Sequence, residues 1–431
     1  MSEIPKIIPT VLADRIMHAC EGAGIGLFYL PIEMEFENSI DIDRLVKAAD
    51  LLMDTHPVLG CRFIVNRKQP YWERFDNKSR SVLKIASSAD EYTEWLTERI
   101  DVEKSPPFAI YILRQGVGDR MCLKVQHQAA DSGGSLEICY KLASIYRKLK
   151  TEPDWKTIPN LLASRGYDQL IRRIPWYAWP KIVWNFFKYH VRTVIPLMSH
   201  SIQVTGKPPF KPSFEVLHFK PERVLRISEH GRAQGATLND MLITAMIRAQ
   251  AAVKKKEDRA AYRLLTTIDF RKWYLPEKRA EDFCNLSGYV YINLGKKLGD
   301  SFDQTLSVIS ADTRCQKEDF YGLHDAIILL FANSLAYNHL KKVLASLAAF
   351  LSTNTNMMNI LTNLGPINED ELIFDENPLR AWVLPPAVFP PILGVGFSGY
   401  GGGLTLATSI YDCDHEIVKE LFKKIEAELS V

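Results

Sequence analysis

Residues 125–134 carry the types and spacing that best suit acid–base chemistry in this sequence. An apolar strand pattern ends at His127, a turn of small residues with two glycines follows, and a helical pattern then begins. A histidine at such a strand end can face a cavity, and its ordinary pKa near 7 suits a general base. Asp131 comes too late to share a strand face with His127, so we expect it to anchor the turn through a cationic partner. From the spacing alone, a loop histidine followed by a helix-capping aspartate is the more frequent explanation.

Other patterns in the sequence are weaker starting points for chemistry. Residues 396–400 resemble the nucleophile elbow of serine hydrolases around Ser398, but Tyr400 stands where that elbow needs its last glycine. The glycine-rich stretch 22–26 has Leu27 in place of the third glycine of a dinucleotide fingerprint. The seven cysteines are scattered and form no CxxC pair, and no HExxH, Walker or EF-hand pattern occurs. We therefore expect neither a bound cofactor nor a metal.

The elements that would position these residues are those of a mixed α/β protein with two lobes. In residues 1–150, strand patterns at 26–36, 59–65, 108–113 and 121–125 alternate with helical patterns at 41–54 and 135–149. Residues 151–212 are rich in proline and aromatic side chains and read as a connector. Residues 213–431 form the second lobe, with strands at 214–219, 262–268, 287–294 and within 372–411, and helices at 238–252, within 303–351 and at 416–429. The pattern at 26–36 is that of a half-buried strand.

These features resemble the chloramphenicol acetyltransferase-like acyltransferases, which carry an HxxxD motif. That superfamily includes peptide-synthetase condensation domains, plant BAHD acyltransferases and alcohol acetyltransferases. Five further segments resemble family landmarks in the same order along the chain, at 51–59, 105–108, 267–271, 285–288 and 362–365, and a sixth follows at 400–412. The chain departs from many members at Gln126, where they have a second histidine, and it lacks the DFGWG motif of the plant enzymes.

The resemblance implies two lobes with an active-site tunnel between them and direct acyl transfer without an acyl-enzyme. His127 would be the general base. Asp131 would pair with Arg271 across the lobes, and Gly133 would support the motif turn. The oxyanion would need preorganised donors. The candidates for these donors and for the tunnel lining are polar residues of the second lobe, among which the sequence does not choose: Ser352, Thr353, Thr355, Asn356 and Asn363.

The substrates implied by the resemblance are an acyl-CoA thioester and a small-molecule alcohol. Two alternatives stay open within the family, a thioester on an acyl carrier protein and an amine acceptor. A third alternative, of another class, is a non-catalytic binding protein on the same fold, although the intact motif at His127 speaks against it.

Composition narrows the remaining possibilities. The 431 residues are 47% hydrophobic and 24% charged, which is typical of a globular protein and excludes a disordered or disulfide-stapled chain. The net charge of +2 gives no reason to expect nucleic acid as a partner. The first residues lack signal-peptide features and no run of 18 apolar residues occurs, so we expect a cytoplasmic protein. The aromatic and basic stretch 174–198 is a candidate for peripheral membrane contact or for a lid.

Overall fold

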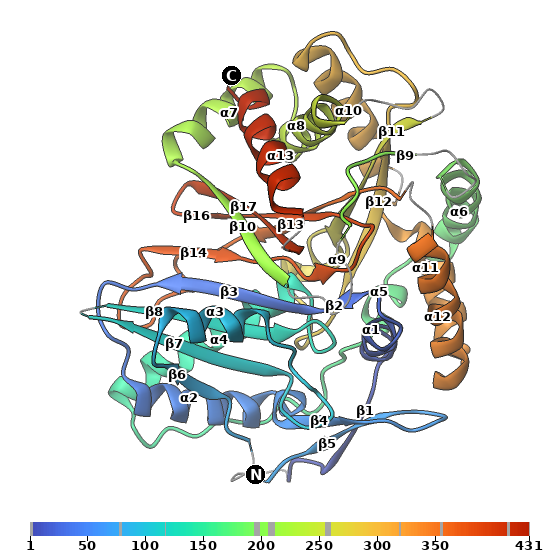
Figure 1. Ribbon diagram of the computed structural model, residues 1–431. Helices are drawn as coiled ribbons and strands as arrows, with labels where there is room; N and C mark the ends of the chain where they lie inside the picture. The colour runs from blue at the N-terminus through green and yellow to red at the C-terminus, as the bar shows by residue number, and fades with distance from the viewer. Residues whose placement is uncertain are drawn as a thin grey trace.

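The computed structural model describes residues 3–76, 80–116, 118–193, 199–205, 212–254, 260–318, 320–353, 357–411 and 414–430. Figure 1 shows two α/β lobes, with the N-terminus in the lower lobe and the C-terminus in the upper lobe. Each lobe is built on its own mixed sheet covered by helices. The predicted fold class, two lobes of mixed α/β structure, is confirmed.

The lower lobe is a five-stranded sheet in the order β14 (Arg380–Val383), β3 (Tyr29–Glu35), β8 (Gly118–Gln126), β7 (Phe108–Gln115) and β6 (Leu83–Ala86). Helices α2 (Ile42–Thr55) and α4 (Ser132–Thr151) bury apolar side chains against one face. Helix α3 (Ala89–Thr97) packs on the other face. A side sheet holds β1 (Ile7–Pro9), β5 (Tyr71–Arg74) and β4 (Cys61–Ile64), and the short helix η1 (Pro57–Gly60) precedes β4.

Strand β3 differs from the prediction, because it is buried along nearly its whole length rather than on one face. Its polar residue Glu33 is fully buried and accepts hydrogen bonds from Tyr92 Oη at 3.0 Å and Arg120 Nε at 2.7 Å. A buried carboxylate needs such partners. The alternation seen in the sequence therefore reflects a satisfied internal ion pair and not a solvent-facing side of the strand.

The upper lobe is a seven-stranded sheet in the order β10 (Pro212–Phe219), β17 (Gly403–Tyr411), β16 (Gly394–Tyr400), β13 (Ile360–Pro366), β11 (Ala261–Asp269) and β12 (Ser287–Asn293), with β9 (Ser199–His200) also paired to β11. Four helices bury their apolar sides in the core of this lobe: α7 (Pro221–Ala233), α8 (Leu238–Val253), α10 (Phe302–Lys317) and α13 (His415–Glu428). The short helices α9 (Phe270–Tyr274) and η3 (Pro276–Lys278) follow β11.

The lobes exchange chain near the C-terminus. Strand β14, drawn in orange along the blue β3 in Figure 1, comes from the predicted second lobe but pairs antiparallel with β3 of the lower sheet. Strand β15 (Ala387–Val388) likewise pairs with β2 (Gly26–Leu27). The division at 1–150, 151–212 and 213–431 remains a prediction, and this exchange crosses it.

The connector contains helices rather than only extended chain. It forms α5 (Asp168–Ile171), η2 (Trp176–Ala178) and α6 (Trp179–Thr193). Helix α6 contacts η4 (Leu323–Asp325) and α11 (Ala326–Ser334), while α12 (Tyr337–Thr353) packs on α1 (Leu12–Gly22). None of the helices in the described ranges has the length and apolar character needed to cross a bilayer.

Candidate active site

His127 lies where the lower sheet ends and faces the space between the lobes. Strand β8 ends at Gln126, and the His127 N–H still donates to the Phe28 carbonyl at 2.7 Å, which holds the backbone in line with the sheet. The Nδ1 atom is buried, so Nε2 is the ring nitrogen that can face the cavity. Burial lowers the pKa of His127, and the Asp131 carboxylate opposes this effect. The imidazole is therefore held in its neutral form, as a general base requires.

Asp131 does not contact His127 as a partner but fixes the turn that follows it. It is the N-cap of α4 and accepts from Gly134 N at 2.9 Å, while its other oxygen accepts from Leu286 N of the upper lobe at 2.6 Å. Arg271 Nη1 also donates to it at 3.0 Å. Burial alone would raise the pKa of Asp131, but Arg271 and the two N–H groups outweigh it and lower the pKa. The carboxylate is therefore ionised and joins the two lobes.

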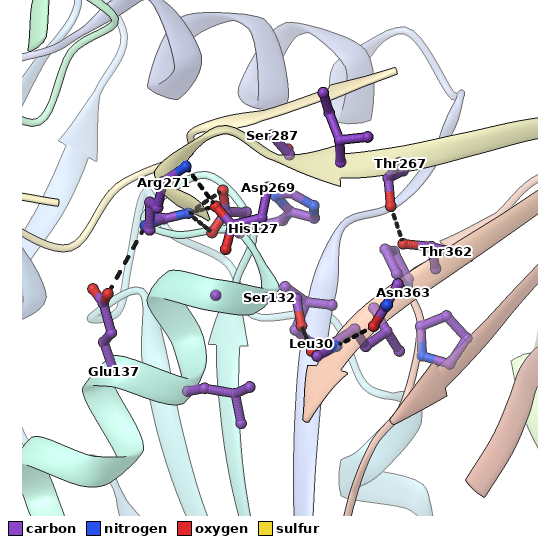
Figure 2. A pocket seen from close by; sticks show the side chains of 18 of the residues that line it. Leu30, His127, Ser132, Glu137, Thr267, Asp269, Arg271, Ser287, Thr362 and Asn363 are labelled. Carbon is purple, nitrogen blue, oxygen red and sulfur yellow. Dashed lines mark hydrogen bonds and ion pairs between the residues drawn. The ribbon is translucent and has the colours of Figure 1, made fainter. Parts of the chain in front are cut away.

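Arg271 makes the predicted pair with Asp131 as part of a larger buried cluster. Only 1% of Arg271 and 4% of Asp131 are exposed. The guanidinium also donates from Nη1 to Asp269 Oδ1 at 3.1 Å and from Nη2 to the Cys284 carbonyl at 2.6 Å. Figure 2 shows Arg271 between Asp269 and Glu137, whose Oε1 lies 3.9 Å from Arg271 Nε. These hydrogen bonds and ion pairs together fix the position of the buried guanidinium group.

The two glycines of the motif turn let the Arg271 guanidinium come this close to α4. A Cβ atom on Gly133 would lie 3.1 Å from Asp269 Oδ2 and 3.2 Å from Arg271 Nη1. A Cβ atom on Gly134 would lie 2.9 Å from the Cys284 carbonyl oxygen and 3.2 Å from Arg271 Nη2. A side chain at Gly133 would crowd Arg271 and Asp269, and Gly134 is under the tighter constraint because its nearest neighbour is a backbone oxygen.

A second clamp on the same turn comes from Arg165, which sequence reasoning missed. Its buried guanidinium donates to the Ala129 carbonyl at 3.0 Å, to the Phe283 carbonyl at 3.0 Å and to both oxygens of Asp14 at 3.0 and 3.1 Å. Asp14 also accepts from Trp72 Nε1 at 2.8 Å. Arg165 lies in the proline-rich connector and belongs to no sequence motif, so its partners could not be predicted from the sequence.

A cavity of about 610 Å³ lies between the lobes and includes His127. Its apolar part is lined by α1 and the segment that follows it, with Ile16, Met17, Ile25 and Phe28. Its exposed charged lining residues are Lys272 on α9 and, at or just after η3, Glu277, Lys278 and Arg279. The cavity therefore joins an apolar lining to a rim on which cations outnumber acidic groups, with the histidine among its lining residues.

Several polar groups face this cavity. Thr267 Oγ1 and Thr362 Oγ1 share a hydrogen bond of 2.6 Å across β11 and β13 (Figure 2). Glu137 also lines the cavity, and burial raises its pKa to about 7, with Arg271 opposing. Ser132 Oγ, at the start of α4, donates to the Leu364 carbonyl at 2.7 Å and so ties the motif helix to the upper sheet.

The five oxyanion and tunnel candidates fall in different places. Asn363 lines the cavity, and its Oδ1 accepts from Gly365 N at 2.9 Å. The backbone of Ser352 and Thr353 ends helix α12, whose earlier turns pack on α1. Thr355 and Asn356 lie outside the described residues. Of the five, Asn363 is thus the one whose described side chain reaches the cavity.

Two residues with nucleophilic side chains, Ser398 and Cys20, are in surroundings that do not favour attack. Ser398 is buried inside β16, where its Oγ accepts from the Val383 N–H at 3.1 Å, so it does not stand on an exposed elbow. Cys20 lines the cavity, but burial raises the pKa of its thiol to about 12. A neutral thiol is a poor nucleophile at neutral pH.

Comparisons with known proteins fit this architecture. No family model matches the sequence. The chain is 22% identical over 399 residues to an uncharacterized protein of Mycobacterium tuberculosis, strain H37Rv, covering 86% of this chain and 87% of that protein.

Three solved structures superpose over nearly the whole chain. Trichothecene 15-O-acetyltransferase from Fusarium sporotrichioides has a TM-score of 0.74 at 13% identity, over 98% of this chain and 94% of that one. Polyketide synthase associated protein 5 from M. tuberculosis has a TM-score of 0.66 at 14% identity, over 98% and 99%. The first condensation domain of the CDA synthetase has a TM-score of 0.66 at 14% identity, over 98% and 96%. The chain therefore has the chloramphenicol acetyltransferase-like fold that its sequence predicts, the fold of these condensation and acetyltransferase proteins.

Proposed function

We propose that this protein transfers an acyl group from a thioester, in the first instance an acyl-CoA, to the hydroxyl of an apolar alcohol. The observation that carries the proposal is a histidine at a cavity between two lobes, on a turn that two buried arginines hold in place. Two of the structural neighbours are an O-acetyltransferase and a condensation domain, and acyl transfer is the reaction class that suits both this fold and a histidine base at the cavity.

The reaction would need one base and no covalent intermediate. Nε2 of neutral His127 takes the proton of the acceptor hydroxyl while the hydroxyl oxygen attacks the thioester carbonyl carbon. The tetrahedral intermediate collapses with cleavage of the C–S bond, and the proton passes from the imidazolium to the departing thiolate. The products are an ester and a free thiol, and His127 is neutral again. The hydroxyls of Thr267 and Thr362 and the Asn363 amide are the candidate donors to the oxyanion.

Asp131 and Arg271 are positioning residues in this scheme. Their pair fixes the start of α4 and, through Leu286 N and the Cys284 carbonyl, the facing segment of the upper lobe. A shift of the turn by a fraction of an ångström would move Nε2 away from the acceptor oxygen. Their replacement should therefore lower kcat without removing the base.

The cationic rim supports a phosphate-bearing donor. Lys272 and Lys278 are exposed at the cavity and can bind phosphate. Both CoA and the phosphopantetheine arm of a carrier protein carry phosphate. A carrier-protein thioester or an amine acceptor is the second candidate within the class, favoured by the condensation-domain neighbours. A binding protein without catalysis is the candidate of another class.

One assay separates these candidates. Free-thiol release is followed with acyl-CoAs of increasing chain length and with an acyl carrier protein thioester, each with pooled alcohols and pooled amines. Wild-type protein should release thiol faster with an acceptor than without it, and His127→Ala should lose about 100-fold in kcat while still binding the donor. His230→Ala is the matched control, because this histidine lies on α7 and pairs with Asp303 at 2.8 Å, away from the cavity.

The outcomes discriminate the proposals. Thiol release with the carrier-protein thioester but with no acyl-CoA would show that the donor is the carrier protein and not CoA. Thiol release with amines but with no alcohol would show that the acceptor is an amine. Equal and negligible release by wild type and His127→Ala across every pair would refute catalysis and leave the binding protein.

A further inference from the structure

We propose that the chain binds the surface of an anionic lipid bilayer through an aromatic face on the connector side of the molecule. The aromatic face is defined by six exposed rings, Trp176, Tyr177, Trp184, Phe187, Phe331 and Phe350. They come from η2, α6, α11 and α12. Figure 1 shows α6, α11 and α12 together at one edge of the structure, and η2 directly precedes α6 in the chain. This inference goes beyond the proposed reaction and does not depend on it.

The rings of the aromatic face are not needed for the core beneath them. Trp176 is 84% exposed and Trp184 is 68% exposed, although α6 already buries Ile182 and Asn185 on its other side. Within α6, Trp184 and Phe187 are three residues apart, so they project from one side of this helix, and Trp176 and Tyr177 lie on η2 immediately before it. Exposed aromatic side chains gathered on one face mark an interaction site.

The charge of the surrounding sequence selects the partner. Between Asp168 and Glu215 there is no acidic residue. The basic residues of this segment whose side chains the structure describes are Arg172, which pairs with Glu281, and Arg173, Lys181 and Lys188. Between Asp325 and Glu369 there is again no acidic residue, and Lys341 and Lys342 add positive charge. The chain as a whole has 53 basic and 51 acidic residues, so this concentration is local. Acid-free basic segments around Trp, Tyr and Phe fit an anionic bilayer surface.

The position of the face relative to the cavity fits the same partner. Helix α12 packs on one side of α1 through Tyr337, Leu340 and the α1 residue Leu12. The α1 residues Ile16 and Met17 line the apolar end of the cavity. Helix α1 thus lies between α12, which carries part of the aromatic face, and the apolar lining of the cavity. A lipid surface at this place would bring a membrane-dissolved apolar substrate next to the cavity.

The test is vesicle co-sedimentation of the full chain. Vesicles of phosphatidylcholine alone are compared with vesicles that also contain phosphatidylglycerol, at low and at high salt. The wild type should bind the anionic vesicles and lose binding as salt screens the charges. Trp176→Ser with Trp184→Ser should lower the partition coefficient by about tenfold or more. Lys181→Glu with Lys342→Glu should lower it on anionic vesicles alone; Lys188 is avoided because it interacts with Asp312 of α10.

Matched controls use other exposed apolar and basic residues, away from the aromatic face. Leu225→Ser with Leu379→Ser removes side chains that are 53% and 62% exposed on α7 and next to β14, and should leave partitioning unchanged. Lys423→Glu with Lys424→Glu on α13 is the control for charge. Thermal unfolding of each variant checks that it is folded.

Three outcomes would overturn the proposal. The first is no binding of the wild type to anionic vesicles at low salt. The second is that the tryptophan variant and the leucine control variant bind the anionic vesicles equally well. The third is a concentration-dependent dimer in sedimentation velocity that Trp176→Ser with Trp184→Ser abolishes while no vesicle binding occurs, because the face would then be covered by a second copy. Since none of these measurements requires turnover, they cannot be confused with a failure of the proposed reaction.

Discussion

Replacing Asp131 by Asn should be the most informative single change in the site. One carboxylate oxygen accepts from Arg271 Nη1 and from Leu286 N, and the other accepts from Gly134 N. An amide keeps one of these oxygens and turns the other into an NH₂ group, which must then face an N–H donor. The change also leaves the buried Arg271 charge with two acidic partners, Asp269 at 3.1 Å and Glu137 at 3.9 Å.

The expected cost follows from these contacts. Breaking a buried ion pair by removing one partner costs about 3–5 kcal/mol, and Asp269 offsets part of it, so we expect a loss of about 3 kcal/mol in the free energy of unfolding. Glu35→Gln is the matched surface change, since Glu35 pairs with the mostly exposed Arg380, and it should cost about 0.5 kcal/mol or less.

Urea unfolding and kcat measure this prediction, and a double-mutant cycle with Arg271→Met isolates the pair. The coupling should be about 1 kcal/mol or more, since the side chains touch. The folded-state pKa of Asp131 is lowered, so its contribution is fully present above the ordinary value of about 3.9 and is lost as pH falls through the lowered value. The gap between wild type and variant should therefore shrink at acid pH. Additive effects in the cycle, or a gap that is constant with pH, would refute the reasoning.

Three further predictions concern the same cavity. Because burial lowers the pKa of His127, the rise of wild-type kcat/KM with pH should have its midpoint below pH about 6.5, and a rise centred above that value would contradict a buried neutral base. Gly134→Ala should lower the melting temperature more than Gly133→Ala, since its Cβ meets a backbone oxygen at 2.9 Å, and an equal loss in the two variants would contradict this packing. The raised pKa of Glu137, about 7, predicts a change in KM near pH 7 that disappears in Glu137→Gln, and a persisting change would assign the titration to another group.

Local patterns and the family resemblance together predicted the structural elements around the HxxxD segment. The helix expected at 135–149 is α4 at Ser132–Thr151, and it starts earlier because Asp131 caps it. The helix expected at 41–54 is α2 at Ile42–Thr55. These features depend on neighbouring residues, so periodicity and capping suffice to find them. The contact between Asp131 and Arg271 spans 140 residues, and the resemblance was needed to predict it.

Long-range partners without a pattern could not be predicted. Arg165 reaches Asp14 across 151 residues and the Ala129 carbonyl across 36, and neither partner is marked in the sequence. The burial of β3 was missed because Glu33 looks like a surface residue until Tyr92 and Arg120 are known to meet it. Such ion pairs depend on how strands from distant parts of the chain are ordered in the sheet.

The pairing of β14 with β3 has a consequence for synthesis of the chain. Strand β3 lies between β8 and β14, so until residues 380–383 leave the ribosome it is an open edge of the lower sheet. At about 5–20 residues per second, the nascent chain would spend roughly 10–50 seconds between the emergence of α4 and that of β14. An unpaired edge strand invites pairing with other chains. The lower lobe is therefore prone to aggregation during translation until β14 is synthesised and covers the edge of β3.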